Sequence, residues 1–387
     1  MEKKLKILFL CSWYPNPDEK SNGIFIKRHA LALSLQHHVT VVFVKAVSVK
    51  DALTIVNEEE NFTEHLYFYP KIKSKVPGLS SAIKLLKFRE HYKKVLDQLI
   101  ETQFDVIHVN TVFPAAIPAL YAQKKYPAAK LFITEHWSGY YSEDGNYKGR
   151  VLRYYTKQLV EKAKAIFVIS KKLQQAMLAR GLKSNYELIN NVVDTTVFIP
   201  FQNSEKTDAT LKILHVSSLV EREKNISGIL AVAYELSKKN KAFHLTIVGE
   251  NNNEMHTHRS LVQKYNLTEK ITFTGFQTSS EIANYMNKAD VFLLLSHYEG
   301  MPVVVLESLA CGLPVITTNV GEIPAMVKLG MGIVLNNTFE MDSVESLLKY
   351  KREDFLDKTH LHKYITEFYS PEAVCKQISK LYTTYSC

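Results

Sequence analysis

Residues 291–312 read VFLLLSHYEGMPVVVLESLACG, and this stretch decides the fold class. The run 291–295 is apolar throughout, which predicts a strand buried on both faces, as the strands of parallel sheets are. A short loop follows, and Pro302 suits the first position of a helix that continues through apolar residues to Ala310. A buried strand, a loop and a helix in this order are typical of a βαβ unit.

The same alternation of apolar strands and amphipathic helices extends in both directions from this stretch. Before it, strands are expected at 6–11, 39–44, 106–110, 131–134 and 166–170, and helices at 24–35, 115–125 and 152–164. After a polar segment at 201–210 the pattern restarts, with strands expected at 212–217, 243–249, 271–275 and 314–317 and helices at 227–237 and 279–288. The sequence therefore predicts two doubly wound α/β domains with parallel sheets, joined by a short linker and facing a cleft.

The expected boundaries follow from this pattern. The N-terminal domain is expected to cover residues 1–200, and the C-terminal domain residues 201–369. Ser370, Pro371 and Glu372 have the residue types of an N-cap, a first helical position and an acidic first turn. A last helix is therefore expected over residues 370–387.

Composition limits the classes of protein to consider. The chain has 387 residues, of which 46% are hydrophobic and 22% charged, which is typical of a folded globular protein. Its four cysteines show no paired spacing, which argues against a disulfide framework or a zinc site and fits a reducing compartment such as the cytoplasm. No window approaches the roughly 18 consecutive apolar residues of a membrane span. The short apolar run at 7–11 is expected to be a buried strand and not a signal peptide.

The net charge of +9 is unevenly distributed. Residues 1–200 contain 29 lysine and arginine residues against 18 aspartate and glutamate residues, whereas residues 201–387 contain 19 against 21. This asymmetry indicates an anionic partner for the N-terminal half, either a phospholipid surface, a phosphorylated carrier or nucleic acid, unless the charge is simply a solvated face. Nucleic acid is not expected as a partner, because no motif combines aromatic and basic residues as RNA-binding proteins do.

The loop and helix after residue 295 can form a ligand site. In open α/β sheets, ligands bind beyond the carboxyl ends of the strands. The amides and the positive dipole end of the helix that begins at Pro302 are suited to a phosphate group. Glu307 lies among apolar residues of the same helix, so its carboxylate needs a partner, which could be a ligand hydroxyl or a group of the protein itself.

Five segments in order resemble the retaining glycosyltransferases of family 4, which have the GT-B fold of two Rossmann-like domains facing an interdomain cleft. The most specific segment is Glu299–Pro324, in which Glu299 and Glu307 form an E-x7-E pair. The other segments are 11–15 with 21–25, then 134–139, 191–198 and 217–225. Together they span nearly the whole chain.

The resemblance implies a role for each matching residue on the donor side. Glu299 is expected to contact a hydroxyl of the transferred sugar, and the amides of Gly300 and Met301 to hold the sugar and diphosphate. Glu307 is expected to bind the ribose hydroxyls. Lys224 matches the phosphate-binding lysine of the family. The resemblance implies that these residues bind a nucleotide sugar, linked to UDP or GDP, as a co-substrate, and no other cofactor is expected.

The chain departs from the family where a second phosphate contact is expected. The family usually has an arginine where Ser218 stands, and Arg222 is the candidate to supply this cation from a shifted position.

In the N-terminal half, the resemblance implies that Gly23 offers amides to the diphosphate and that His136 lies near the transferred sugar. The structural alternatives are an ordinary loop-to-helix junction at Gly23 and a loop-stabilising role for His136.

No metal motif is present in the sequence, since no D-x-D or clustered His and Cys set occurs. This agrees with the metal-independent transfer that the resemblance implies. Neither G-x-G-x-x-G nor G-x-x-x-x-G-K-[ST] occurs either, which weakens a dinucleotide-dependent oxidoreductase or a P-loop enzyme.

The resemblance predicts a glycosyltransferase whose N-terminal domain binds the acceptor, a glycan or lipid-linked intermediate of surface polysaccharide assembly. The last helix is expected to cross back to the N-terminal domain. The alternatives are a nucleotide-sugar epimerase of the same architecture and a non-catalytic nucleotide-sugar-binding protein.

Basic and apolar residues mix at helical spacing over 71–96, which indicates either a peripheral contact with the inner face of the plasma membrane or an ordinary packed helix.

Overall fold

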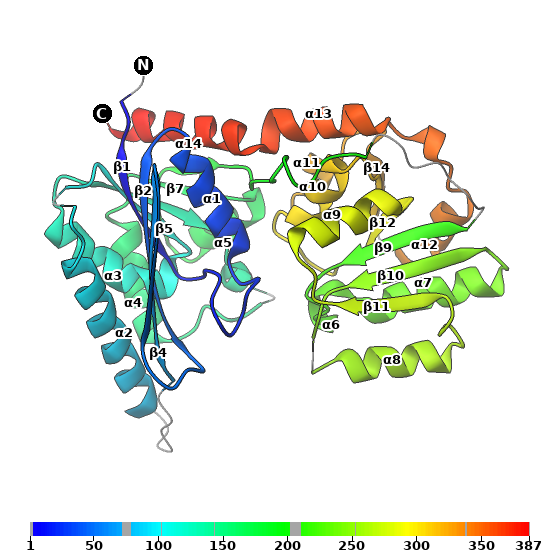
Figure 1. Ribbon diagram of the computed structural model, residues 1–387, viewed down its shortest axis with the longest axis horizontal. Coiled ribbons are helices and arrows are strands. Elements are labelled where there is room, and N and C mark those ends of the chain that lie inside the picture. Colours follow the sequence, from blue (N-terminus) through cyan, green and yellow to red (C-terminus); the bar gives the residue numbers. More distant parts are fainter. Residues whose placement is uncertain are drawn as a thin grey trace. The chain divides into compact units, whose positions relative to one another are not determined.

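The computed structural model describes residues 3–71, 79–101, 103–142, 144–201, 210–251, 253–336 and 339–386 (Figure 1). The chain forms two compact units. Unit 1 comprises Met1–Val192 together with Pro371–Cys387, and unit 2 comprises Val193–Ser370.

Unit 1 is built on an eight-stranded sheet in the order β3-β4-β2-β1-β5-β6-β7-β8. Its strands are β1 (Lys6–Cys11), β2 (His38–Val47), β3 (Leu53–Glu59), β4 (Phe62–Pro70), β5 (Val106–Asn110), β6 (Lys130–Glu135), β7 (Ala165–Val168) and β8 (Tyr186–Leu188). All neighbours pair in parallel except β3, which is antiparallel to β4. The predicted parallel sheet therefore carries one antiparallel strand at this edge, because only two residues separate β3 from β4, too few for a crossover connection.

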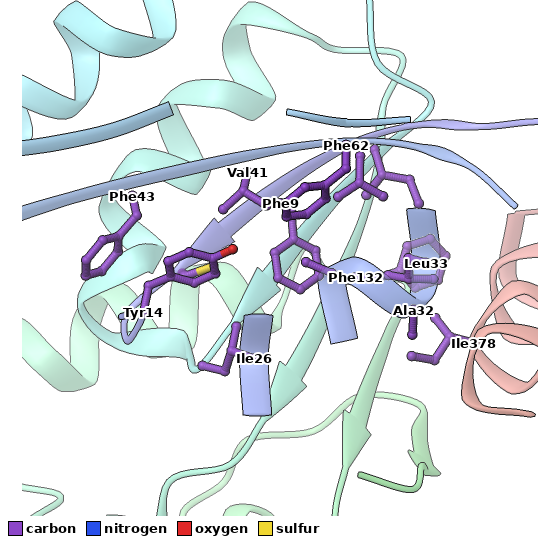
Figure 2. Packing of buried hydrophobic residues seen from close by; sticks show 14 of the residues in the cluster. Phe9, Tyr14, Ile26, Ala32, Leu33, Val41, Phe43, Phe62, Phe132 and Ile378 are labelled. Carbon is purple, nitrogen blue, oxygen red and sulfur yellow. The ribbon is translucent and has the colours of Figure 1, made fainter. Parts of the chain in front are cut away.

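Helices cover both faces of the sheet of unit 1. They are α1 (Ile24–Ser34), α2 (Leu79–Asp97), α3 (Val112–Lys125), α4 (Arg150–Val160), α5 (Lys171–Ala179) and α14 (Pro371–Ser386). Ile7, Phe9 and Cys11 of β1 share a cluster with residues of α1 and α14, whereas α3 packs against β1, β5 and β6. Figure 2 shows Phe9 and Phe132 of the sheet in one cluster with α1 and with Ile378 of α14. The last helix of the chain thus completes the core of the first unit.

Unit 2 contains a six-stranded sheet in the order β11-β10-β9-β12-β13-β14, and every pair within it is parallel. The strands are β9 (Leu211–Val216), β10 (Phe243–Val248), β11 (Ile271–Gly275), β12 (Val291–Leu294), β13 (Val315–Thr318) and β14 (Gly332–Leu335). Helices α9 (Ser279–Lys288), α10 (Val303–Ala310) and α13 (Lys358–Tyr369) pack on one face, and α7 (Ile226–Lys238), α8 (Met255–Lys264) and α12 (Phe339–Leu348) on the other. This architecture is a doubly wound α/β domain.

The boundary between the units lies eight residues earlier than the sequence predicts. The expected boundary was at residue 200, whereas unit 2 begins at Val193. Val193 and Phe198 are fully buried in the core of unit 2, because their apolar side chains pack there before the polar segment starts. The predicted linker at 201–210 lies mostly outside the described residues.

Among the described residues, no helix is both long enough and apolar enough to cross a membrane. In the described ranges the cysteines Cys11, Cys311 and Cys375 are buried and free of disulfides. Residues 72–78 of the predicted basic segment lie outside the described part of the chain. Residues 79–96 of that segment lie in α2.

Candidate functional site

The order of the sheet in unit 2 reverses between β9 and β12, which are neighbours at its centre. From this point β10 and β11 extend one way, and β13 and β14 extend the other way. Ligands of open α/β sheets bind beyond the carboxyl ends of the strands at such a switch point. Here β9 leads into the short helix α6 (Glu221–Lys224), and β12 leads into the loop at 295–302 that precedes α10.

Hydrogen bonds join α6 to the loop after β12, and three of them carry the argument. The Lys224 ammonium donates to Glu299 Oε1 over 2.6 Å. The amide of His297 donates to the carbonyl of Glu223 over 2.9 Å, and the hydroxyl of Tyr298 donates to the Glu223 carboxylate over 3.1 Å. Lys224 and Glu299, which are 75 positions apart in the sequence, are therefore held side by side.

The Glu299 carboxylate is partly shielded and has one oxygen turned to the protein. Its side chain is 9% exposed, and that of Lys224 is 17% exposed. Ser296 Oγ donates to Glu299 Oε1 over 2.7 Å, so both side-chain partners of Glu299 among the described residues use the same oxygen. Oε2 therefore remains able to accept from a ligand hydroxyl. An ammonium has three donors, so Lys224 can keep this pair and also bind a phosphate oxygen.

Arg222 lies on the same helix as Lys224 but is much more exposed. Its side chain is 61% exposed, and its guanidinium lies 5.8 Å from the centre of the Tyr298 ring. It is also 3.6 Å from the carboxylate of Glu223. The structure thus places Arg222 on α6 beside Lys224, at the carboxyl end of β9. The role of Arg222 toward a second phosphate stays a prediction.

Helix α10 begins one residue later than predicted. Pro302 has extended backbone angles, φ −70° and ψ 110°, and is the N-cap residue, so the first helical residue is Val303. Gly300 and Met301 directly precede this helix start, as the sequence indicates. Glu307 lies in α10 and is 8% exposed, which places a carboxylate in the apolar packing of this face.

Gly321 fixes the backbone of the loop that carries Glu299. It has a φ of +60°, and a Cβ atom built on it would lie 2.3 Å from the carbonyl oxygen of Gly300 and 2.4 Å from that of Glu299. The next amide, that of Glu322, donates to the Gly300 carbonyl over 2.9 Å. The loop between β13 and α11 (Ile323–Met326) therefore packs directly against the loop at 295–302 that carries Glu299.

We expect Gly321→Ala to lower kcat/KM about tenfold or more, because the added methyl group must displace the Glu299–Gly300 backbone, and misplacement by about 1 Å can cost about 100-fold. Gly181→Ala is the matched control. Gly181 also has a positive φ, +77°, but a Cβ at this position would have no atom within 4 Å, so the control carries similar backbone strain without displacing the loop. Equal activity of the two variants, measured at matched folded fraction, would show that Gly321 does not position the loop.

In unit 1, Gly23 lies at a tight junction between a loop and α1. Its φ is +67°, and a Cβ there would lie 2.6–2.7 Å from backbone atoms of Trp13 and Tyr14. Gly23 is the N-cap residue of α1, and its carbonyl accepts from the amides of Ile26 and Lys27. The close approach of the two backbones explains why glycine is required here.

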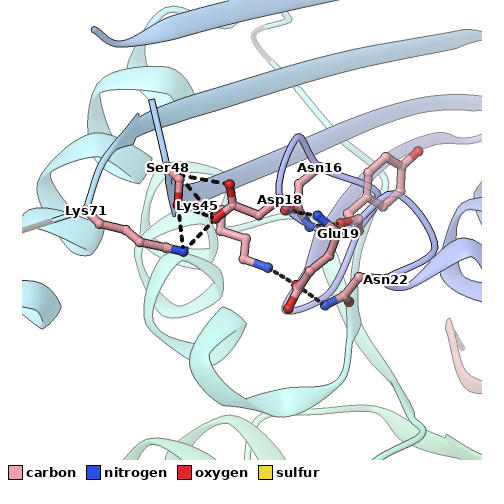
Figure 3. A network of polar contacts seen from close by, with 8 residues as sticks. Asn16, Asp18, Glu19, Asn22, Lys45, Ser48 and Lys71 are labelled. Atoms are coloured by element: carbon pink, nitrogen blue, oxygen red, sulfur yellow. Dashed lines mark hydrogen bonds and ion pairs between the residues drawn. The ribbon is translucent and has the colours of Figure 1, made fainter. Parts of the chain in front are cut away.

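A network of polar contacts holds the loop that precedes Gly23 (Figure 3). The Asp18 carboxylate accepts from Lys71 over 2.6 Å and from the amide of Ser48 over 3.0 Å. Glu19 accepts from Lys45 and from Asn22. The hydrogen bonds with Lys71 and Ser48 hold the pKa of Asp18 below its usual value. The loop is thus tied to the end of β2 before it enters α1.

The loop after β6 is organised by Glu135 and not by the ring of His136. The buried Glu135 carboxylate accepts from the amides of Val112, His136 and Trp137 and from the hydroxyl of Tyr140, over 2.8–3.0 Å. Burial nevertheless raises the pKa of Glu135. Both ring nitrogens of His136 are buried, and neither has a hydrogen-bond partner among the described residues. Among the described residues this imidazole therefore packs against the rings of Phe25 and His29 and makes no hydrogen bond.

Sequence reasoning missed four residues that shape these sites: Ser296, Glu223, Gly321 and Glu135. Three of them lie inside the family-like segments, but a motif does not show which neighbour a residue packs against. The sequence gives only a weak indication of Ser296, which directly follows the apolar run 291–295 and precedes Glu299 by three positions.

In the described ranges, no group of three or more His, Cys, Asp or Glu side chains is placed to hold a metal ion.

Two family descriptions match the chain in succession. The family described as Glycosyltransferase Family 4 matches residues 24–197, and the family described as Glycosyl transferases group 1 matches residues 198–382. The two matches meet within a few residues of the boundary between the units.

Individual relatives cover different shares of the chain. The putative colanic acid biosynthesis glycosyltransferase WcaL of Escherichia coli K12 is 34% identical over 143 residues, which is 35% of this chain and 34% of that protein, so the match spans only about a third of its length. The putative teichuronic acid biosynthesis glycosyltransferase TuaC of Bacillus subtilis is 24% identical over 90% of both chains. The crystal structure of Anabaena HepE in complex with UDP-glucose is similar in fold, with a TM-score of 0.68 and 14% identity over 98% of this chain and 100% of that chain.

Proposed function

The chain belongs to the family 4 glycosyltransferases, and from this premise we propose that it transfers a sugar from a nucleotide sugar to a glycan or lipid-linked acceptor with retention of anomeric configuration. In this proposal unit 2 binds the donor and unit 1 binds the acceptor. The names of WcaL and TuaC, which refer to colanic and teichuronic acid, support an acceptor in surface polysaccharide assembly.

The observation that carries the proposal is the pairing of Lys224 with Glu299 at the switch point of unit 2. A cation beside a carboxylate suits a sugar diphosphate, whose two ends differ in charge. Lys224 binds the diphosphate, while Glu299 accepts from a sugar hydroxyl through Oε2. An epimerase or a binding protein could use the same pair, so the proposal requires that an acceptor receives the sugar.

The proposed reaction replaces the diphosphate by the acceptor on the same face of the sugar. The bond between the anomeric carbon and the diphosphate oxygen breaks through an oxocarbenium-like state, and the acceptor oxygen attacks from the same face. The leaving diphosphate oxygen takes the proton of the acceptor hydroxyl, so no separate base is needed. Lys224, with Arg222 and the amides of Gly300 and Met301, stabilises the charge that develops on the leaving group. Transfer without a metal ion, and the contributions of Gly23 and His136, stay predictions.

A panel of nucleotide sugars tests the proposal. A ligand at about 100 times its Kd adds about 2.7 kcal/mol to stability, which a thermal shift of the full chain detects. UDP-glucose is the first probe because it is bound to HepE, followed by other UDP- and GDP-linked sugars. The expected result is a shift with one donor, followed by nucleoside diphosphate release that depends on an acceptor fraction. Acceptor-independent conversion of the sugar would instead identify an epimerase.

We expect Glu307→Ala to weaken nucleoside diphosphate binding by roughly 1.5–3 kcal/mol, because hydrogen bonds to a charged group contribute about this much. Isothermal titration with UDP and GDP measures the change. Glu345→Ala is the matched control, since Glu345 lies on a helix of the same unit but is exposed and pairs with Lys349. Unchanged nucleotide affinity in Glu307→Ala would remove Glu307 from the ribose site.

The basic surface of α2 gives a separate prediction about the membrane. Lys84, Lys87, Lys93 and Lys94 are exposed, and Leu86 is 63% exposed beside them. Each cation near an anionic bilayer contributes about 1 kcal/mol. Replacing the four lysines by Gln is therefore expected to lower affinity for vesicles containing phosphatidylglycerol more than tenfold, without lowering nucleotide affinity.

The control for this experiment removes the same charge elsewhere in unit 1. Lys157, Lys162, Lys164 and Lys171 are also exposed, and their replacement by Gln leaves α2 intact. Cosedimentation at rising salt measures both variants, since screening acts within a Debye length of about 8 Å at physiological salt. Equal vesicle binding by the two quadruple variants would show that α2 is an ordinary solvated helix.

A further inference from the structure

Helix α6, which carries Lys224, is a single turn of four residues, Glu221–Lys224, and none of the four is buried. A helix this short is not stable in water by itself, so its position depends on the groups that bind it. Lys224 and Glu223 bond the loop after β12. A second set of contacts joins α6 to α7 and α8 of the same unit (Figure 1).

The Glu221 carboxylate is the centre of this second set. It accepts from the amide of Ser227 over 3.1 Å and from the hydroxyl of Ser227, in the first turn of α7. His258 Nε2, on α8, lies 3.2 Å from Glu221 Oε2 and donates to it, because an ionised carboxylate only accepts. Burial alone would raise the pKa of Glu221, but the hydrogen bonds from Ser227 and His258 lower it below its usual value. The ionised side chain of Glu221 therefore ties α6 to two longer helices.

The backbone that leads into α6 is held by residues just before α8. Glu254 Oε2 accepts from the amide of Glu221 over 2.7 Å and from Nδ2 of Asn251 over 3.0 Å. The same Nδ2 donates to the carbonyl of Leu219 over 3.2 Å. Leu219 has a φ of +55°, in the left-handed region that residues other than glycine rarely adopt. The entry into α6 is thus a strained turn that these contacts keep in place.

His258 is buried in a way that packing alone does not explain. It is 1% exposed, and its Nδ1 has no hydrogen-bond partner among the described residues. In that part of the chain the ring makes one hydrogen bond, the bond to Glu221. A buried polar atom without a partner costs stability, so an apolar side chain of similar size would stabilise α8 better. The bond to Glu221 is what histidine supplies at this position.

We propose that His258 and Glu221 are positioning residues that hold Lys224 at the diphosphate. His258 orients the Glu221 carboxylate and Glu221 fixes α6, whose last residue is Lys224. Neither positioning residue contacts the substrate. The inference rests on the proposed function, in which Lys224 is the group that binds the diphosphate. If α6 shifts, the contact with the phosphates weakens while the rest of the nucleotide site is unchanged.

The variant His258→Leu tests the inference, because leucine has about the volume of histidine but no hydrogen-bonding atom. We expect its affinity for the nucleoside diphosphate that binds the parent, UDP or GDP, to fall about tenfold, equivalent to about 1.4 kcal/mol. The affinity for the matching nucleoside, uridine or guanosine, is expected to stay unchanged, because a nucleoside has no phosphate for Lys224 to bind. Isothermal titration of the full chain measures both. An equal loss for the nucleoside and the diphosphate would overturn the inference.

Three companion variants separate positioning from stability. His258→Gln keeps a donor near the position of Nε2 and is expected to recover most of the affinity. His256→Leu makes the same substitution at an exposed position of α8 and should change neither affinity. Val262→Ala removes buried apolar volume from α8 and should lower the melting temperature without weakening UDP or GDP binding. A loss of affinity in Val262→Ala as large as that in His258→Leu would overturn the inference.

A double-mutant cycle tests whether His258 acts through Lys224. In a Lys224→Met background, His258→Leu is expected to cause almost no further loss of diphosphate affinity, since residues that act through one another have non-additive effects. An equal loss in both backgrounds would overturn the inference. If His258→Leu does not fold, Glu221→Ala breaks the same hydrogen bond at a partly exposed side chain and gives the binding result.

Two results separate this inference from the proposed function. If Lys224→Met weakens UDP or GDP binding and His258→Leu does not, the positioning role is overturned and the proposed function stands. If both variants weaken binding but no acceptor receives the sugar, transfer is contradicted and the positioning role stands.

Discussion

Lys224→Met is expected to lower kcat/KM by about 100- to 1000-fold, the usual effect of removing one group that stabilises leaving-group charge. The ammonium is 2.6 Å from Glu299 and only 17% exposed, so methionine removes the charge and leaves the carboxylate with Ser296 alone. The rate of nucleoside diphosphate release from the donor that the panel identifies measures the effect.

Two companion variants separate catalysis from folding. Lys238→Met removes an exposed lysine of the same unit, 3.0 Å from Glu235, and is expected to keep full activity. Lys224→Met combined with Glu299→Gln removes the carboxylate that has lost its cation, so it should recover stability while activity stays low. A kcat/KM for Lys224→Met within threefold of the parent would contradict the assignment of Lys224 to the diphosphate.

Tyr382→Ala is expected to destabilise unit 1 by about 3–5 kcal/mol, as large-to-small changes of buried aromatic residues do. Tyr382 is 1% exposed, and its ring lies 4.9 Å from that of Phe132 and 6.2 Å from that of Phe167. Its hydroxyl shares a hydrogen bond with Nδ1 of His108, and Nε2 of His108 shares one with Oγ1 of Thr134. Calorimetry measures the change, with the transition of unit 2 as an internal reference.

Comparison variants divide this effect into its parts. Tyr382→Phe keeps the ring and loses only the bond to His108, so a cost of about 0.5–1.5 kcal/mol is expected. Tyr154→Ala removes a tyrosine of α4 that is 60% exposed, and a change within about 0.5 kcal/mol is expected. If Tyr382→Ala shifts the unit 2 transition and not that of unit 1, the placement of α14 in the core of unit 1 is wrong.

The buried strands could be predicted closely from sequence because their signal is local. The bounds of β1, β5, β11 and α9 match the expected ranges. An apolar run marks β1 and β5, alternating apolar and polar residues mark β11, and a capping box marks the start of α9. The hairpin of β3 and β4 was missed. β3 is exposed along almost its whole length, so it lacks the apolar run that identified the other strands.

The site was predictable in its residue types but not in its contacts. The E-x7-E pair and Lys224 could be identified from motifs, whereas the bond between Lys224 and Glu299 depends on β9 and β12 being neighbours in the sheet. Nothing in the local sequence marks that pairing, because parallel partners are far apart along the chain. The unpaired nitrogens of His136 were likewise hidden, since only the packed structure shows what surrounds a ring.

The contribution of α14 to unit 1 has a consequence for synthesis on the ribosome. Unit 2 is continuous in the chain, from Val193 to Ser370, and can complete its fold as soon as that segment has left the exit tunnel. The first 192 residues emerge earlier but must wait for Val374, Ile378 and Tyr382 before the α1 face of their sheet is covered. The half of the protein that is translated first is therefore the last to mature, and during that interval its apolar face is open to chaperones.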